Sequence, residues 1–291
     1  MYSQNHRVPT VVAELIRFAV IIILTTVIAF FVSTTAVQRT QTQENSAVWN
    51  DLSEKIANIE KAQLASAPLY PALQGKTIIY DGDSIAESRQ NNGGGYPSLI
   101  ADITGGTYKN FAVGGARLCS YAGKHSVVDN LKNLPADGDL YCFEGGINDF
   151  WGNTPLGICT PGDYSGPLDT RTICGAMEAI FRHCMTNYPG KPVCFVIVHK
   201  VQQTAYKPNA NGDTSADYRN AMIQVCQKYS VPYYDAFGES GLNGWDTKQS
   251  ELFLTANDTA IGDGIHPNVE GYKRYYIPQL LSLFEQIMPV D

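Results

Sequence analysis

The residues Thr77-Ile-Ile-Tyr-Asp-Gly-Asp-Ser84 give the clearest signal for the fold, because a short strand-like run passes directly into a turn and then toward a helix. Gly82 permits a tight turn, and Ser84 stands where its hydroxyl can be exposed at a helix N-terminus. Taken alone, Asp and Ser before a helix are also ordinary capping residues. The stretch therefore marks the end of a strand as the place to look for chemistry.

Outward from this stretch, short strand-like runs alternate with longer helical ones. Strands are predicted over residues 77–80, 107–111, 140–144, 193–198 and 231–234. Amphipathic helices are predicted over residues 173–188, 215–229 and 269–287. This alternation indicates an α/β domain over residues 73–291, with a doubly wound parallel sheet of five strands between two helical layers. In such sheets, ligands bind beyond the carboxyl ends of the strands.

The composition places the chain among globular proteins. Of its 291 residues, 44% are hydrophobic and 17% are charged, which excludes a disordered or collagen-like chain. A formal net charge of −7 leaves no excess of Lys and Arg to neutralise phosphates. We therefore expect no nucleic-acid partner.

An uncharged apolar segment over residues 18–37 precedes the domain. As a helix it would extend about 30 Å, the thickness of the bilayer core, so we expect a single-pass membrane anchor. Arg7 and Arg17 precede it and only Arg39 follows closely, which favours a cytoplasmic N-terminus over residues 1–17 and a domain outside the cytoplasm. A signal sequence cleaved after Ala36 is the alternative.

Residues 38–72 are expected to form a stalk or linker. Val48, Leu52, Ile56 and Ile59 follow one another at helical spacing along one face. A coiled-coil contact between chains and a helix lying on the main domain are both compatible with this pattern. The oligomeric state is therefore left open.

The seven cysteines are an odd number, so at least one is outside any intramolecular disulfide. None has the CxxC or Cys/His spacing of a zinc site, and we expect no metal. Cys159 and Cys174 bracket a loop rich in Gly and Pro, and they are the pair to test for a bridge.

Two more predicted strand ends and one segment near the C-terminus carry unusual residues. The second strand runs into Asn110-Phe-Ala-Val-Gly-Gly115, and the third into Gly145-Gly-Ile-Asn-Asp149. Near the C-terminus, Asp263 precedes His266 by three residues, a spacing at which a turn can bring a carboxylate and an imidazole to one site. Turn formation alone would also account for each glycine.

Together, in this order, these blocks resemble the SGNH/GDSL hydrolase family. The resemblance covers the chain from about Leu73 to its C-terminus and departs from the family pattern at Ile85, where the family has Leu. It implies a flavodoxin-like fold of the SGNH hydrolase type. The matching residues are Gly82, Asp83 and Ser84; Asn110 and Gly115; Gly146, Asn148 and Asp149; and Asp263 and His266.

The resemblance also implies a role for each residue. Ser84 would be the nucleophile, His266 the general base, and Asp263 the carboxylate that orients the imidazole. The backbone N–H groups of Ser84 and Gly115 and the side-chain amide of Asn148 would hold the oxyanion. Asp83 and Asp149 are expected to be structural. This chemistry implies neither a metal nor an organic cofactor.

Three further residues are candidates for substrate contacts. Phe150 and Trp151 directly follow the third block, where they can wall a pocket, stack on a sugar ring or plug the core beneath a loop. His199 follows the fourth strand, a position that also suits an ordinary partly buried histidine. Trp245 is a further candidate for the rim of the site.

These observations lead us to expect a membrane-anchored, extracytoplasmic serine esterase. Its expected substrate is an O-acyl ester, with acetyl groups on a carbohydrate favoured. An O-acyltransferase acting on cell-wall or surface glycans would use the same residues. A non-catalytic binding or adhesion module with the same fold is the alternative from another class.

Overall fold

The computed structural model describes residues 14–15, 17–26, 52–55, 69–88, 91, 94–202, 207–256 and 262–289. The chain divides into two compact units, Met1–Ser66 and Ala67–Asp291. Most of the expected stalk lies outside the described residues.

Residues 17–26 of the first unit are helical. The remainder of the expected membrane segment, residues 27–37, lies outside the described part of the chain. Among the described residues, no helix has both the length and the apolar character of a bilayer span.

Five parallel strands form a single sheet in the second unit, in the order β2-β1-β3-β4-β5. This confirms the predicted sheet and its flavodoxin-like order. The chain steps outward from β1 to β2 and then crosses back to β3, so the direction of winding reverses between β1 and β3. The strands are β1 (Thr77–Asp81), β2 (Thr107–Asn110), β3 (Leu140–Gly145), β4 (Val193–Ile197) and β5 (Tyr233–Asp235).

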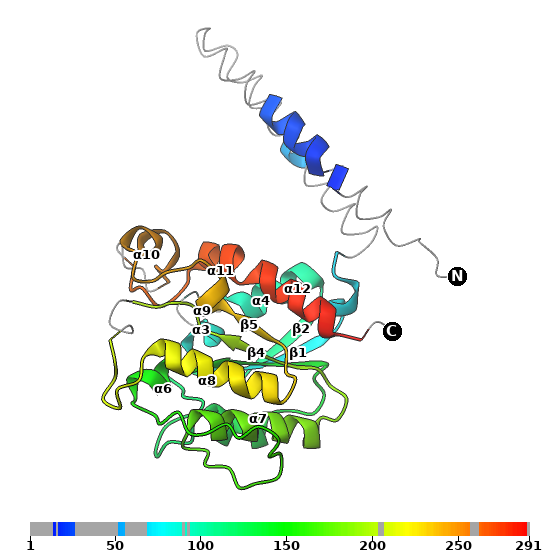
Figure 1. Cartoon of the computed structure of the whole chain (residues 1–291). Helices are drawn as coiled ribbons and strands as arrows, with labels where there is room; N and C mark the ends of the chain where they lie inside the picture. Colours follow the sequence, from blue (N-terminus) through cyan, green and yellow to red (C-terminus); the bar gives the residue numbers. More distant parts are fainter. Residues whose placement is uncertain are drawn as a thin grey trace. The chain divides into compact units, whose positions relative to one another are not determined.

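Helices cover both faces of the sheet (Figure 1). The helices α4 (Tyr96–Thr104), α11 (Val269–Tyr275) and α12 (Ile277–Ile287) lie on one face, and α7 (Ile173–Asn187) and α8 (Ser215–Lys228) lie on the other. The shorter helices are α3 (Ser84–Glu87), α5 (Val127–Asn130), α6 (Ile147–Trp151), α9 (Ala236–Glu239) and α10 (Thr247–Phe253), with 3-10 turns η1 (Pro71–Leu73) and η3 (Leu131–Asn133).

Burial along the strands follows their place in the sheet. All six residues of the central strand β3 are buried, whereas the edge strand β2 is polar and largely exposed. The chain after β2 therefore lies near the rim of the sheet, and the chain after β1 and β3 lies at its centre. Ligands of doubly wound sheets bind at this central reversal of the strand order.

The helix predicted over residues 269–287 is wrong as a single element. The structure has two helices there, α11 and α12, which meet at Tyr276. Pro278 stands in the first turn of α12. Proline has no N–H to donate, and its ring clashes with the carbonyl of the preceding turn, so it favours a new helix start over a continuous helix.

A layer of tyrosines packs between the sheet and the helices α4, α11 and α12. Tyr96 stacks on Tyr276 with ring centroids 5.8 Å apart, and Tyr80 meets Tyr96 edge-on at 5.6 Å. All three side chains, together with Tyr272, are fully buried. Aromatic pairs of this kind stabilise a core beyond the area that they bury.

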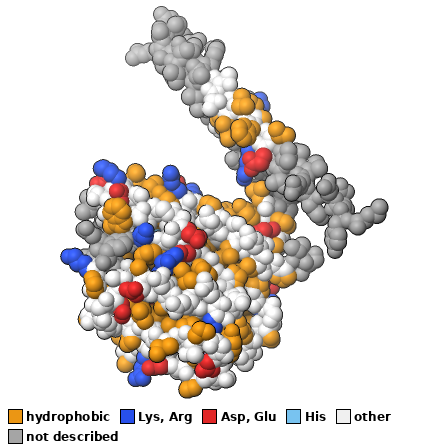
Figure 2. All heavy atoms as spheres, in the orientation of Figure 1, with side chains coloured by type: hydrophobic (Ala, Val, Ile, Leu, Met, Phe, Trp, Pro, Cys, Tyr) orange, Lys and Arg blue, Asp and Glu red, His pale blue; other side chains and the backbone are white. Residues whose placement is uncertain are grey.

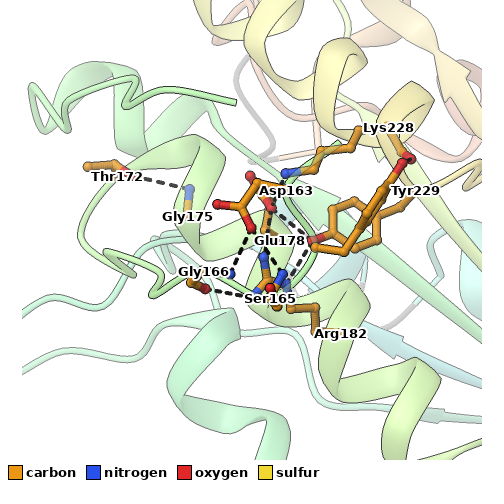
Figure 3. A network of polar contacts seen from close by, with 10 residues as sticks. Asp163, Ser165, Gly166, Thr172, Gly175, Glu178, Arg182, Lys228 and Tyr229 are labelled. Carbon is orange, nitrogen blue, oxygen red and sulfur yellow. Dashed lines mark hydrogen bonds and ion pairs between the residues drawn. The ribbon is translucent and has the colours of Figure 1, made fainter. Parts of the chain in front are cut away.

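The segment between α6 and α7 is a long connection that is tied to the helices beneath it (Figure 3). Glu178 Oε2 accepts hydrogen bonds from Lys228 Nζ at 2.6 Å and from the Tyr229 hydroxyl at 2.8 Å. Arg182 Nη1 donates to the Gly166 carbonyl at 2.8 Å. The side chains of Glu178 and Lys228 are each only 4% exposed, so a buried ion pair joins α7 to α8. The hydrogen bond from Arg182 to Gly166 holds the connection onto α7.

All seven cysteines are free thiols in the structure, and the pair Cys159 and Cys174 is not bridged. Cys174 is buried at the start of α7, and Cys159 is partly exposed. Burial raises the pKa of the Cys174 thiol to about 11. This thiol is therefore protonated at neutral pH.

Candidate active site

The turn after β1 places Ser84 at the first position of α3. The side chain of Asp83 caps this helix, because its Oδ1 accepts from the Ile85 N–H at 3.0 Å. Gly82 is required by close packing, since a Cβ there would lie 2.8 Å from Glu144 Oε2 and 2.9 Å from the Glu144 carbonyl oxygen. The block Gly82-Asp83-Ser84 thus brings β1 against β3 and then presents the serine, which is partly exposed.

Ser84, His266 and Asp263 form a hydrogen-bonded chain. His266 Nε2 lies 2.9 Å from Ser84 Oγ, although the two residues are 182 positions apart. On the other side of the ring, His266 Nδ1 lies 2.6 Å from Asp263 Oδ2. An imidazole held in this way can take the proton of the hydroxyl while the carboxylate stabilises the imidazolium.

The turn between Asp263 and His266 explains how two residues only three positions apart can form a hydrogen bond through their side chains. Gly264 has φ +70°, which lets the chain fold back on itself. Asp263 Oδ1 then accepts from the backbone N–H groups of Ile265 at 2.8 Å and His266 at 2.9 Å. The carboxylate and the imidazole are therefore fixed by the same turn.

The electrostatics of Asp263 suit a carboxylate that stays ionised. Partial burial by itself would raise the pKa of Asp263. The hydrogen bonds from the His266 ring and from the two backbone N–H groups outweigh burial and lower the pKa below its usual value. Asp263 therefore carries a negative charge at neutral pH, next to Nδ1 of the imidazole.

Asn148 lies at the second position of α6, directly after β3. Its Nδ2 donates to Asp83 Oδ2 at 3.1 Å and to the Ala116 carbonyl at 3.0 Å. The amide is thereby held between the turn that carries Ser84 and the loop after β2.

The loop after β2 is drawn toward α3 by two side chains. Asn110 Nδ2 donates to the Ala86 carbonyl at 2.7 Å, and Glu87 Oε2 accepts from the Gly114 N–H at 2.9 Å. A Cβ on Gly114 would lie 3.7 Å from Ser84 Cβ, which places this loop directly beside the serine. Gly115 follows with φ +79° and is exposed. Three of the sequence blocks thus meet at the ends of β1, β2 and β3, and the fourth reaches them through His266.

Asp149 is fully buried and hydrogen bonds to the segment that contains Leu118 and Cys119. Its carboxylate accepts from the N–H groups of Leu118 at 2.9 Å and Cys119 at 3.2 Å. Burial raises its pKa in spite of these bonds. The contacts show that Asp149 holds the segment that follows Ala116.

The structure places Phe150 and His199 inside the core, which corrects the expectation that they contact substrate. Phe150 is 3% exposed and meets Tyr218 edge-on at 5.6 Å. His199 is 1% exposed, and its Nδ1 lies 2.7 Å from the Tyr276 hydroxyl. Both line a cavity of only about 20 Å³, which has room for roughly one water molecule. Burial, followed by the nearby His266, lowers the pKa of His199 to about 3.

Trp151 and Trp245 keep exposed rings close to the site. Trp151 ends α6 and is 37% exposed, and Trp245 is 53% exposed. A Cβ on Gly244 would lie 2.0 Å from the Gly264 carbonyl oxygen, so the chain at Trp245 runs directly against the turn that carries His266.

Glu144 and Glu87 are site residues that the sequence blocks do not include. Glu144 Oε2 accepts from the N–H groups of Asp83 and Ala86, each at 3.2 Å. One signal for Glu144 was present in the sequence, because a charged residue stands inside an otherwise apolar strand just before Gly145-Gly146. Glu87 had no comparable signal, since acidic residues are common in the first turn of a helix.

Comparisons with known proteins agree with this geometry. The model of the GDSL-like lipase/acylhydrolase family matches residues 82–274. A solved structure that is 27% identical superposes with a TM-score of 0.64 and covers 75% of this chain and 100% of its own. No match was found among curated proteins.

Two more solved structures share the fold. A possible lipase from Chitinophaga pinensis is 18% identical, with a TM-score of 0.58, and the match covers 72% of this chain and 98% of that one. A salicylyl-acyltransferase from a tetracycline biosynthetic pathway is 18% identical, with a TM-score of 0.51, and the match covers 75% of this chain and 57% of that one. The family match, which includes the nucleophile turn and the turn at His266, shows that the chain belongs to the GDSL-like lipase/acylhydrolase family of SGNH-type ester hydrolases.

Proposed function

We propose that the protein cleaves O-acyl esters through an acyl-Ser84 intermediate. The observation that carries this proposal is the chain of hydrogen bonds from Ser84 Oγ through His266 to Asp263, next to the amide of Asn148. A serine hydroxyl is too basic to attack a carbonyl unaided and needs such a base.

In the first step, Ser84 Oγ attacks the acyl carbon while His266 Nε2 takes the hydroxyl proton. The negative charge moves to the carbonyl oxygen, which the N–H groups of Ser84 and Gly115 and the amide of Asn148 stabilise. The imidazolium then gives its proton to the leaving alkoxide as the C–O bond breaks. Water repeats the sequence on the acyl-enzyme and releases the acid.

Asn148 must free one amide hydrogen for this role, because both are engaged in the structure. The bond to Asp83 comes from the turn that carries the nucleophile, whereas the bond to the Ala116 carbonyl lies on the loop side. We propose that the oxyanion replaces the Ala116 carbonyl and that the bond to Asp83 remains. Contacts of this kind often reach their final geometry only when substrate is bound.

We propose an acetylated carbohydrate as the substrate class. Trp151, three residues after Asn148 on α6, and Trp245 both have exposed indole rings, and indoles stack on sugar rings. A small acyl group suits a site whose neighbouring cavity, lined by Phe150 and His199, holds about one water.

We further propose that residues 18–37 anchor the protein in a membrane, with residues 1–17 in the cytoplasm and the hydrolase unit outside. Phe18, Ile21, Ile22 and Ile23 support this proposal, because each is at least 56% exposed on the described helix. Contiguous exposed apolar side chains mark a membrane or protein contact. The sequence stays uncharged through Val37.

An O-acyltransferase is the second candidate, since the fold is shared with a salicylyl-acyltransferase. In that reaction a sugar hydroxyl replaces water in the second half, and Ser84, His266 and Asp263 keep the same roles. Product analysis with and without an acceptor sugar distinguishes the two activities.

The test of the nucleophile is Ser84→Ala. We expect the variant to lose hydrolysis of a short-chain nitrophenyl ester by at least about a thousandfold while remaining folded. Labelling with a fluorophosphonate followed by peptide mapping should modify Ser84 in the wild type. Ser98→Ala, a serine on α4, is the matched control and should keep both activity and labelling. Unchanged turnover in Ser84→Ala would refute the proposal.

A further inference from the structure

We propose that Glu144, which lies outside the four sequence blocks, is a positioning residue that carries a proton at neutral pH and holds the turn around Ser84 in its active geometry. The proposal deepens the proposed function and rests on the role of Ser84 in it.

The contacts of Glu144 lie on both sides of the serine. Its Oε2 accepts from the N–H of Asp83, the residue before Ser84, and from the N–H of Ala86, two residues after it. The side chain of Glu144 also fills the space beside Gly82, where a Cβ would approach Oε2 to 2.8 Å. One carboxyl group from β3 therefore sets the path of the chain from Gly82 to Ala86.

The surroundings of Glu144 favour its neutral form. Its side chain is fully buried, and the ionisable groups that face it come from its own strand, from the nucleophile turn and from the layer of tyrosines. These groups are Cys142, Asp83, Tyr96, Tyr272 and Tyr276. A thiol and three phenols are uncharged at pH 7, and Asp83 can only repel a second negative charge. Burial of a carboxylate without a neighbouring cation strongly disfavours the charged form, so a proton is retained instead.

The second oxygen of Glu144 agrees with this assignment. Among the described residues, no donor reaches the buried Oε1. A carboxylate oxygen without a donor is costly in the core, whereas the hydroxyl oxygen of an acid donates and needs no donor. Burial first, and then the charge of Asp83, raise the pKa of Glu144 well above its usual value.

Asp83 is the ionised member of this pair because both of its oxygens accept hydrogen bonds. Oδ1 accepts from the Ile85 N–H, and Oδ2 accepts from the amide of Asn148. The two carboxyl groups also hydrogen bond to each other, which fits a protonated Glu144 that donates to Asp83. Burial raises the pKa of Asp83 to about 6. The pair thus shares one proton at neutral pH and links the Ser84 turn to Asn148.

The test compares Glu144→Gln with Glu144→Leu. The glutamine carbonyl can accept the two N–H groups, and its amide can donate to Asp83, so we expect kcat within about threefold of wild type at pH 7. Leucine has the volume but neither function, and we expect kcat to fall by about a hundredfold with little change in KM. A Glu144→Gln variant as inactive as Glu144→Leu, or a Glu144→Leu variant with wild-type kcat, would overturn the proposal.

A second measurement does not depend on activity. A group with a raised pKa in the folded state binds more protons there than in the unfolded chain, so its contribution makes stability fall as pH rises. We therefore compare the unfolding equilibrium constants of the wild type and of Glu144→Gln between pH 5.5 and 7. The ratio of the wild-type constant to the variant constant should rise by about a factor of ten for each pH unit. Equal slopes would show that Glu144 is ionised, whether or not Glu144→Leu folds.

Glu178→Gln is the matched control, because Glu178 is an equally buried acid that faces a cation (Figure 3). Its partner Lys228 would lose the carboxylate, so we expect a lower melting temperature at pH 7 with unchanged kcat. Glu144→Gln should instead keep its melting temperature at pH 7. If the wild type does not hydrolyse esters and the fluorophosphonate does not modify Ser84, the proposed function is wrong. The pH dependence of the unfolding equilibrium constant still shows whether Glu144 is protonated.

Discussion

Single side chains at this site are held by more than one element of the fold. Asn148 comes from the end of β3, yet its amide bonds to the turn after β1 and to the loop after β2. His266 comes from the C-terminal part of the chain and reaches the serine at 2.9 Å. The geometry of each group therefore depends on the sheet order that brings these segments together.

At the residue scale, we predict that Asn148→Ala lowers kcat by about a hundredfold to a thousandfold with a small change in KM. The amide would stabilise charge that develops only in the transition state, and removal of one such donor has this typical effect. Steady-state kinetics on a nitrophenyl ester measure it.

Asn187→Ala is the control for that experiment, because Asn187 is exposed at the end of α7 and bonds only to the His183 carbonyl among its described contacts. It should leave both constants unchanged. An Asn148→Ala enzyme with wild-type kcat would exclude this residue from oxyanion stabilisation.

Strands and helices of this fold contact one another at places where the backbone and side chains leave no room for a residue larger than glycine. At the end of β1, the chain passes within van der Waals reach of Glu144 on β3, and glycine is the residue that fits. The long connection after α6 is held differently, because Arg182 on α7 donates to the carbonyl of Gly166 in this connection. The close packing at Gly82 and the side-chain contacts of the connection each hold in place a segment that has little helix or strand of its own.

At the element scale, we predict that Gly82→Ala destabilises the protein by about 1 to 3 kcal/mol and lowers kcat. The added Cβ would force β1 and β3 apart, or would displace the carboxyl of Glu144. Denaturant unfolding and ester kinetics measure the two effects.

Gly105→Ala serves as the comparison, because Gly105 has open space around it and only its φ of +67° opposes the substitution. We expect it to cost about 1 kcal/mol through backbone strain and to leave kcat unchanged. Equal effects of the two substitutions would mean that close packing at Gly82 does not control the site.

At the scale of the whole molecule, charges are mixed over the surface of the hydrolase unit. Figure 2 shows Lys and Arg side chains interspersed with Asp and Glu on the visible face. The first unit differs, because its described helix carries the exposed side chains of Phe18, Ile21, Ile22 and Ile23. This contrast supports the proposal that the first unit contacts a membrane.

We predict that the full chain floats with phospholipid vesicles in a density gradient and that Ile23→Arg weakens this association. A charge in the middle of an apolar segment opposes insertion by about 3 kcal/mol. Ile23→Leu is the control and should float like the wild type. A wild-type chain that stays in the vesicle-free fraction would exclude the anchor.

Much of the fold followed from local pattern. The mostly apolar run of β3 and the alternation of short and long runs predicted five parallel strands, because a strand buried on both faces has a recognisable composition. The break at Tyr276 was also predictable in principle from Pro278. The sequence also indicated the helix that begins at Ser84. The helices α4, α5, α6, α9 and α10 were not predicted, because their apolar patterns are too short to show a period.

Local patterns in the sequence were enough to predict the class of fold, the family and the candidate site residues Ser84, Asn148, Asp263 and His266, because each lies next to a strand or turn whose signals are local. The burial of Phe150 and His199, and the contact of Glu144 with the turn that carries Ser84, became visible only in the folded chain. Burial and contact between carboxyl groups depend on how β1 and β3 pack, and residues 61 positions apart in the chain, such as Asp83 and Glu144, carry no local sign of that meeting.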